Sequence, residues 1–167
     1  MQPKLQETYY SYSSPISLLE ELFFQLEWNY ERLVENELVA EIQGRWCSYQ
    51  LFALWRPDLE CFMFSALVDI KVPQTKRKDV EILLSMLNPK VLLGHFEVSP
   101  DDDLPVFRYS LTLRGNPGAT LEQMEEIINN AVLECDRLYP ALQFVLWGDK
   151  NPEEALMAAM LDTYGEA

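Results

Sequence analysis

The sequence predicts an α+β domain, with an antiparallel sheet of about five strands covered by helices in the order α-βββ-α-ββ-α and a C-terminal tail helix. Apolar residues recur at helical spacing in three long segments and form short strand-like runs in five others. Short links between consecutive strands favour antiparallel pairing. The 167 residues suffice for one domain, which we place at residues 14–149, between a loose arm (1–13) and the tail helix (150–167).

The first half of the domain is predicted to hold one helix and three strands. Ser14 is a plausible N-cap, and Pro15 suits the first position of the helix. Its apolar face consists of Ile16, Leu18, Leu19, Leu22, Phe23 and Leu26. Three strands follow, at residues 38–43, 49–56 and 61–70. The third is expected inside the sheet, because apolar residues occur on both of its faces.

The second half is predicted to alternate helix, strands and helix. A helix over residues 75–87, with Thr75 as a candidate cap, precedes strands at residues 92–98 and 106–113. A long helix begins at Thr120, where Gln123 completes a capping box. Pro140 is expected to kink this helix. A last helix covers residues 152–164, and we expect it to dock weakly on the domain.

Charge is unevenly distributed along the chain. There are 13 Lys and Arg residues against 27 Asp and Glu residues, giving a net charge of -14. The acidic excess lies in residues 1–44 and 120–167, whereas residues 45–119 hold nine charges of each sign. Proteins that bind nucleic acid or dock on anionic membranes present positive charge. We therefore expect neither nucleic acid nor a membrane as a partner.

The N-terminal residues, the lengths of the apolar runs and the cysteines together predict the cellular compartment. The first residues lack the basic-then-apolar layout of a secretion signal. No apolar run approaches the roughly 20 residues of a membrane span. Three widely spaced cysteines fit a reducing compartment. These features predict a cytoplasmic protein.

Catalytic and metal-binding motifs are not recognisable. His95 is the only histidine and is expected to be a half-exposed strand residue. The cysteines form no CxxC pair, so a zinc site would need chance convergence. Asp101, Asp102 and Asp103 are consecutive, unlike the alternating ligands of a calcium loop. We assign no catalytic residue, no metal ligand and no cofactor, and expect that the protein is not an enzyme.

Surplus apolar surface stands out on the second helix. Its core side is supplied by Val80, Leu83, Leu84 and Leu87. Ile82 and Met86 lie about 120–160° away around the helix. The helix is therefore apolar on two sides, and each side should pack against another part of the structure. We predict that Ile82 and Met86 lie in a two-fold dimer interface. Burial under a loop, the arm or the tail is the alternative.

Two other helices show the same surplus. Phe24 and Trp28 lie off the main apolar face of the first helix, and Met157, Met160 and Leu161 cluster in the tail. These five residues are our candidates for contact with a protein partner. Cover by a neighbouring segment of the same chain is again the alternative.

Several short stretches, taken in their order and spacing, resemble one known family. They are Leu83-Leu84-Ser85-Met86-Leu87-Asn88, Gly94-His95-Phe96, Val106-Phe107-Arg108-Tyr109, and Asp136 followed by Pro140 and Leu142. Over residues 16–147 the chain resembles the YbjN family, described as bacterial sensory transduction regulators. The resemblance implies a fold similar to type III secretion chaperones, which are acidic, usually homodimeric, and bind unfolded segments of other proteins. It implies no role for any particular residue.

The expected function is that of a non-catalytic bacterial protein–protein interaction module, chaperone-like or sensory and regulatory, acting as a cytoplasmic homodimer with an unidentified protein partner. Acidity would keep apolar surface soluble and favour basic or partly unfolded clients. The alternative is an enzyme or small-ligand-binding domain with a site between sheet and helices. His95, Arg108, Tyr109 and the tryptophans would then supply its polar groups.

Overall fold

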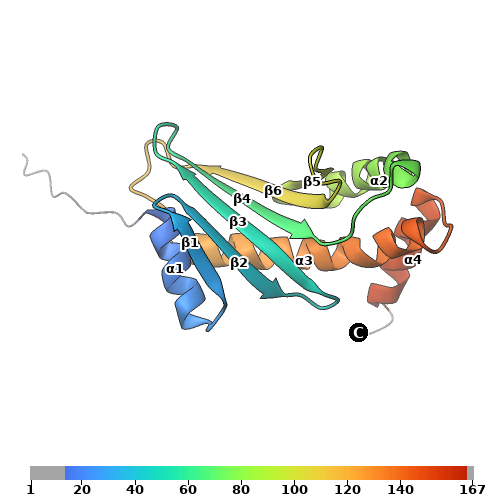
Figure 1. The fold of residues 1–167 in the computed structure, drawn as a ribbon, viewed down its shortest axis with the longest axis horizontal. Helices are drawn as coiled ribbons and strands as arrows, with labels where there is room; N and C mark the ends of the chain where they lie inside the picture. Colours follow the sequence, from blue (N-terminus) through green and yellow to red (C-terminus); the bar gives the residue numbers. More distant parts are fainter. Residues whose placement is uncertain (1–13, 165–167) are drawn as a thin grey trace, which may run out of the picture.

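The structure, a computed structural model, describes residues 14–164, with side chains placed for residues 14–161. The predicted arm, residues 1–13, lies outside the described residues. Six strands form one sheet in the order β1-β2-β3-β4-β6-β5, and all neighbours are antiparallel (Figure 1). The elements are α1 (Pro15–Gln25), β1 (Tyr30–Val34), β2 (Glu37–Gln43), β3 (Ser48–Arg56), β4 (Cys61–Val68), α2 (Gln74–Leu87), the 3-10 helix η1 (Asn88–Lys90), β5 (His95–Val98), β6 (Pro105–Thr112), α3 (Leu121–Leu146) and α4 (Pro152–Tyr164). The predicted α+β class and helix order are confirmed.

Helices α1 and α3 lie against one face of the sheet (Figure 1), and the core lies between this face and the two helices. Alternate residues of β2, β3 and β4 point into this core, as the period of two predicts. The apolar stripe of α3 is buried there, at Met124, Ile128, Ala131, Cys135, Leu138, Leu142 and Val145. Leu26 was expected on the buried face of α1 but is exposed, because it is the C-cap and follows the last helical residue.

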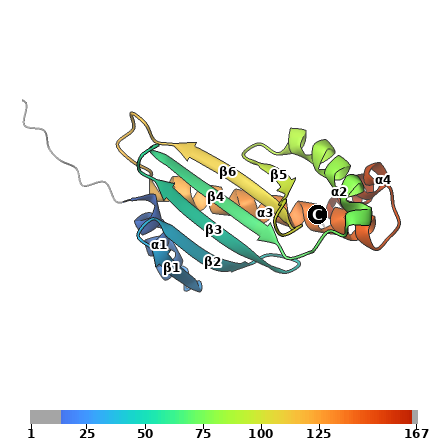
Figure 2. The same ribbon diagram turned by 45° about the horizontal axis from the view of Figure 1, so that its top comes forward.

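Helix α3 is longer than the part of the sheet that it covers. Its 26 residues span about 39 Å, and its C-terminal part extends past the sheet, where α2 and α4 pack beside it (Figures 1 and 2). Pro140 lies buried inside α3, and the helix continues to Leu146. Ala155, Leu156 and Ala159 of α4 are also buried. The tail helix therefore contributes buried residues to this helical end, and its weak docking stays a prediction.

Strand β1 is absent from the sequence-based prediction. Its residues are half-buried or exposed, and its only neighbour in the sheet is β2. An edge strand that buries few side chains does not need alternating apolar and polar residues. The period-two pattern that predicts a strand is therefore missing from this segment. The sheet therefore has six strands instead of about five.

The other boundaries differ by a few residues. Helix α2 begins at Gln74, with Pro73 as its N-cap and no side-chain cap, so Thr75 is not the cap. Strand β5 starts only at His95, because Gly94 has a φ of 85° and a Cβ there would lie 2.5 Å from the Phe107 ring. The cap at Ser14 and the capping box at Thr120 are confirmed.

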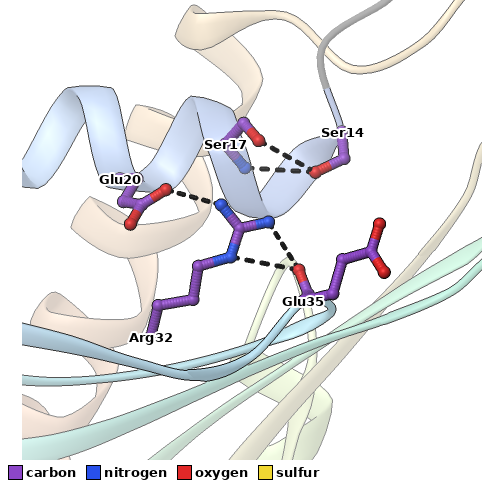
Figure 3. A network of polar contacts seen from close by, with 5 residues as sticks. All are labelled: Ser14, Ser17, Glu20, Arg32 and Glu35. Atoms are coloured by element: carbon purple, nitrogen blue, oxygen red, sulfur yellow. Dashed lines mark hydrogen bonds and ion pairs between the residues drawn. The ribbon is translucent and has the colours of Figure 1, made fainter.

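A polar network ties α1 to the edge of the sheet (Figure 3). Arg32 of β1 donates from Nη1 to Oε2 of Glu20 at 2.7 Å, and from Nε to the carbonyl of Glu35 at 3.1 Å. Ser14 Oγ accepts from the backbone N–H of Ser17 at 3.2 Å and caps the helix. These contacts hold α1 against the β1–β2 hairpin. The other face of the sheet is left without a helix.

Among the described residues, no helix is both long and apolar enough to cross a membrane.

Candidate functional site

The face of the sheet opposite α1 and α3 is not covered by any element within residues 14–164; we call it the open face (Figure 1). Its apolar centre consists of Val39, Phe52, Leu54, Met63 and Leu67. Val39 is paired with Phe52 across β2 and β3, and Leu54 with Met63 across β3 and β4. Phe52 is 43% exposed and Met63 is 37% exposed. Directly paired apolar side chains left in water are typical of an interaction surface.

Acidic residues border the apolar centre on the side of β1 and β2. In the strand register, Glu31 lies opposite Val39, Glu37 opposite Leu54, and Glu41 opposite Gln50. The open face is hollowed here by a depression of about 510 Å³. Its lining is Asn29, Tyr30, Glu31, Val39, Ala40, Glu41, Gln50, Leu51 and Phe52. Two carboxylates thus border a shallow hollow whose lining is both polar and apolar.

On the side of β5 and β6 the charges compensate one another. Arg108 donates from Nε to Oε1 of Glu97 and from Nη1 to Oγ of Ser65 at 3.4 Å. His95 is exposed on the edge strand, opposite Arg108 in the register. At the far end of β3, Arg56 is paired with Asp58 at 2.8 Å. Because both arginines have acidic partners, the acids beside β1 and β2 give the open face its negative excess.

A second concave site lies at the helical end, where the β2–β3 turn meets α2, α3 and α4. We call it the helical-end cavity; its volume is about 540 Å³. It is lined by Arg45, Trp46, Leu87, Lys90, Leu133, Glu134, Asp136, Arg137, Leu156, Ala159 and Met160. Three of these side chains are basic and two are acidic, so the lining combines both signs of charge with apolar wall.

Asp136 fixes the wall of this cavity. Its Oδ1 accepts from the hydroxyl of buried Tyr49 at 2.6 Å and from the backbone N–H of Arg45 at 2.9 Å. The Trp46 indole N–H donates to the Asp136 carbonyl at 3.0 Å. Burial and the contact with Asp136 raise the pKa of Tyr49 well above its usual range, so the hydroxyl remains a donor. A Cβ at Gly44 would lie 2.2 Å from the Tyr49 ring, so only glycine permits this approach.

Glu134 is a buried acid at the same cavity. It is 3% exposed, and its Oε1 accepts from Arg137 Nη1 at 2.9 Å. Burial raises the pKa of Glu134, and the neighbouring Arg137 only partly opposes that rise. The ion pair therefore does not repay the full desolvation of the carboxylate.

The proposed dimer residues are placed unequally. Ile82 is 41% exposed on α2, whereas Met86 is half-buried and packs against the core. On α1, Phe24 is exposed, whereas Trp28, just beyond the helix, packs against the buried Phe23 ring with 5.6 Å between the ring centres. The structure thus leaves Ile82 and Phe24 in solvent and gives Met86 and Trp28 intramolecular contacts.

The tail candidates lie elsewhere. Met157 and Leu161 are exposed on α4, and Met160 borders the helical-end cavity, where Lys90 Nζ lies 3.6 Å from its sulfur. Helices α1 and α4 lie at opposite ends of the molecule (Figures 1 and 2). The residues of the two helices therefore do not form one partner-binding surface.

The cysteines have different surroundings. Cys135 is buried in α3, where burial raises the pKa of its thiol beyond its ordinary value. Burial also raises the pKa of half-buried Cys47. Within the part of the chain with placed side chains, no cluster of three or more His, Cys, Asp or Glu residues is suited to hold a metal ion.

Sequence reasoning overlooked both concave sites. Apolar residues on the second face of β4 were interpreted only as a sign of a central strand. Phe52 and Leu54 are likewise apolar residues on the second face of β3. Together the two strands indicated an apolar face exposed to solvent. No comparable signal exists for the helical-end cavity, because its lining residues are scattered over residues 45–160.

Comparison with known proteins supports the resemblance noted in the sequence. The sequence model of the YbjN family, described as "Putative bacterial sensory transduction regulator", matches residues 15–144. Among solved structures, the chain is similar to "YbjN, a putative transcription regulator from E. coli", at 19% identity and a TM-score of 0.47. That match covers 72% of this chain and 90% of the other. No curated protein matches the chain.

Proposed function

The chain belongs to the YbjN family, and on that premise we propose that it is a regulatory protein, without a catalytic role, that binds a basic amphipathic segment of another protein on its open face. The single observation that supports this is the paired apolar centre beside the acidic residues of β1 and β2. The three cysteines are not paired in disulfides, and we propose that the protein acts in a reducing compartment such as the cytoplasm.

The apolar centre would supply the affinity. Burying an exposed Phe or Met side chain contributes up to about 1.5–3 kcal/mol. Phe52 and Met63 lie on adjacent strands, and Val39 and Leu54 extend the same surface. A segment with apolar residues on one side covers this area without any change in the sheet.

The acidic border would select the charge of that segment. Glu31, Glu37 and Glu41 lie within one or two residues of the apolar centre in the strand register. Lysine or arginine on the partner would face these carboxylates, and complementary charge speeds encounter and disfavours acidic partners. Binding should weaken as salt is added, because the carboxylates are exposed.

Calorimetry with a short amphipathic peptide of Leu and Lys tests this proposal, with a Leu and Glu peptide of equal length as the charge control. The Leu–Lys peptide should bind the full chain, and Phe52→Ser should weaken binding about tenfold. Leu59→Ser is the matched control, because Leu59 is also exposed but lies in the β3–β4 turn. Glu41→Gln should weaken binding more than Glu125→Gln, which changes an exposed acid on α3.

Two results would count against the proposal. Equal binding of the acidic and basic peptides would remove the role of the carboxylates. Equal effects of Phe52→Ser and Leu59→Ser would show that the peptide does not occupy the open face. A chain lacking residues 2–13 completes the design, since markedly tighter binding by that chain would make the arm the resident occupant.

The homodimer is a separate proposal. Exposed Ile82 would supply its contact on α2, and half-buried Met86 would border it. Light scattering on wild type and Ile82→Glu measures this directly.

A further inference from the structure

We propose that the helical-end cavity binds a small uncharged amphiphile, an apolar chain that ends in a hydrogen-bond donor such as a hydroxyl, and that the second carboxylate oxygen of Glu134 accepts this hydrogen bond. The site is separate from the open face, and its test does not depend on the proposed function.

The size and walls of the cavity fit an apolar chain. Its volume of about 540 Å³ lies within the usual range for small-ligand sites. Leu87, Leu133 and Leu156 supply apolar wall from α2, α3 and α4. A hydrocarbon chain leaves water favourably for such walls, because it needs no polar partner there.

Glu134 has one oxygen that is paired and one that is not. Its Oε1 accepts from Arg137 Nη1 at 2.9 Å, whereas its Oε2 has no hydrogen-bond partner among residues 14–161. Over the same residues, no side-chain nitrogen or oxygen is both shut off from solvent and unpartnered. Oε2 is therefore accessible. Since Glu134 is only 3% exposed and lines the cavity, that access is from the cavity.

An unpartnered carboxylate oxygen beside apolar walls selects a ligand with a donor. A hydrogen bond to a charged acceptor is stronger than a hydrogen bond between neutral groups. A similar ligand without the donor would displace water from Oε2 of Glu134 and put nothing in its place, so the site should reject it.

The ion pair at the cavity favours an uncharged ligand. Arg137 already offsets the charge of Glu134, so a ligand cation at Oε2 would lie close to a guanidinium of the same sign. A ligand anion at Oε2 would meet the carboxylate itself. A hydroxyl avoids both repulsions, and it also gives up less hydration than either ion when it enters an apolar cavity.

Glu134 is held in place before a ligand binds. It lies well inside the 26-residue helix α3, and Arg137, one turn further along, fixes its other oxygen. Trp46, which lines the same cavity, stacks on Tyr139 with 6.4 Å between the ring centres and 7° between the ring planes. Preorganised groups of this kind reduce the ordering cost of binding.

Titration of the full chain with 1-octanol, followed by calorimetry, tests the proposal. Heptyl methyl ether is an isomer of octanol that has an acceptor oxygen but no donor. Octanol should bind with a Kd on the order of 100 μM, and the ether should bind about tenfold more weakly. Octylammonium and octanoate carry charged heads on chains of the same length, and both should bind more weakly than octanol.

A change at Glu134 tests the acceptor. Glu134→Gln replaces a charged acceptor by an amide that both donates and accepts. The preference for octanol over the ether should therefore fall from about tenfold to about twofold. Glu125→Gln is the matched control, because it changes an exposed acid of α3 outside the cavity, and it should leave the preference unchanged.

A change at the apolar wall tests the place of binding. Leu133→Ser should weaken octanol and the ether by the same factor, so the preference between them should persist. Leu133 is exposed, so this variant should fold regardless of how Glu134→Gln behaves, and thermal unfolding checks both. Leu59→Ser, at another exposed leucine, is its control and should not affect either ligand.

Four results would overturn the proposal. They are the absence of octanol binding, equal binding of octanol and the ether by the wild type, tighter binding of either ion, and an octanol preference that survives Glu134→Gln. Equal effects of Leu133→Ser and Leu59→Ser would also contradict it, because octanol would then adsorb outside the helical-end cavity.

Discussion

The open face and the helical-end cavity both present apolar surface, but they are built differently. Three acids, Glu31, Glu37 and Glu41, border the first, whereas side chains of both charges border the second. The open face is a regular array of neighbouring strands. The cavity is assembled from a turn and three helices that are far apart in sequence.

The difference separates two physical roles for polar groups. On the open face the acids are exposed and make few contacts with the core, so they set charge without much effect on stability. At the cavity, Asp136 satisfies a buried hydroxyl and Glu134 is itself buried. Changes at the open face should therefore alter binding alone, and changes at the cavity should alter stability too.

The largest effect is expected at Asp136. Asp136→Ala leaves the buried Tyr49 hydroxyl and the Arg45 N–H without their acceptor, which should cost about 3 kcal/mol of unfolding free energy. Asp136→Asn keeps an acceptor oxygen and should cost less than half as much. Chemical denaturation measures both. A loss below about 0.5 kcal/mol for the alanine variant would mean that this network does not hold the hairpin to α3.

The next effect separates the two faces of α4. Leu156 is 6% exposed and Met157 is 59% exposed. Leu156→Ala should destabilise the chain by about 2–4 kcal/mol, whereas Met157→Ala should stay within about 0.5 kcal/mol. Thermal unfolding of the two variants decides whether α4 belongs to the cooperative core. Equal small effects would restore the weakly docked tail that the sequence suggests.

One variant from each region gives the sharpest contrast in binding. Phe52→Ser should weaken binding of the Leu–Lys peptide about tenfold, near 1.4 kcal/mol. Lys90→Gln, at the helical-end cavity, should leave peptide binding unchanged. Calorimetry with the peptide on both variants completes the comparison. If Lys90→Gln weakens peptide binding as much as Phe52→Ser does, the two regions are coupled.

A smaller effect is expected from the titration of Glu134. Its pKa is raised in the folded protein, so the native state binds more protons than the unfolded one. Stability from this group is therefore lost as pH rises from the ordinary value of 4.5 through the raised one. Glu134→Gln should unfold at a relatively higher temperature at about pH 7.5 than at about pH 4, compared with wild type. The opposite trend would show that the ion pair with Arg137 outweighs desolvation.

The smallest change in stability is expected at Ile82. Ile82→Glu lies on an exposed surface and should shift the unfolding free energy by no more than about 0.5 kcal/mol. We expect it to abolish self-association in light scattering, because two like charges would meet near the dimer axis. Phe52→Ser is the informative comparison. If Phe52→Ser, and not Ile82→Glu, makes the protein monomeric, two copies associate through the open face. A monomeric wild type would contradict the proposed dimer.

Much of the fold followed from local sequence. The Ser14 cap, the Thr120 capping box and the apolar stripe of α3 depend on residues within a few positions of one another. So does the alternation in β4. Local hydrogen bonds and the side-chain periods of helix and strand decide these features wherever the segment lies, and short links decide that neighbouring strands are antiparallel.

Tertiary packing decided the rest. Strand β1 exists because β2 offers it an edge, and β6 rather than β5 pairs with β4. Helix α3 continues beyond Pro140 to Leu146, because this part of the helix is buried by packing. A backbone bond lost at proline costs less than leaving this part of the helix unpacked.

Neither concave site could be placed by the sequence alone. Apolar residues on the outer face of β3 and β4 are visible in the sequence, but only the positions of α1 and α3 determine which face remains open. The cations of the helical-end cavity come from a turn, η1 and α3, and no period relates them. Their convergence depends on Asp136 holding the β2–β3 turn against α3, a contact between residues 91 positions apart. Sequence patterns record the period of single elements, whereas a site built by long-range contacts exists only once those elements have packed.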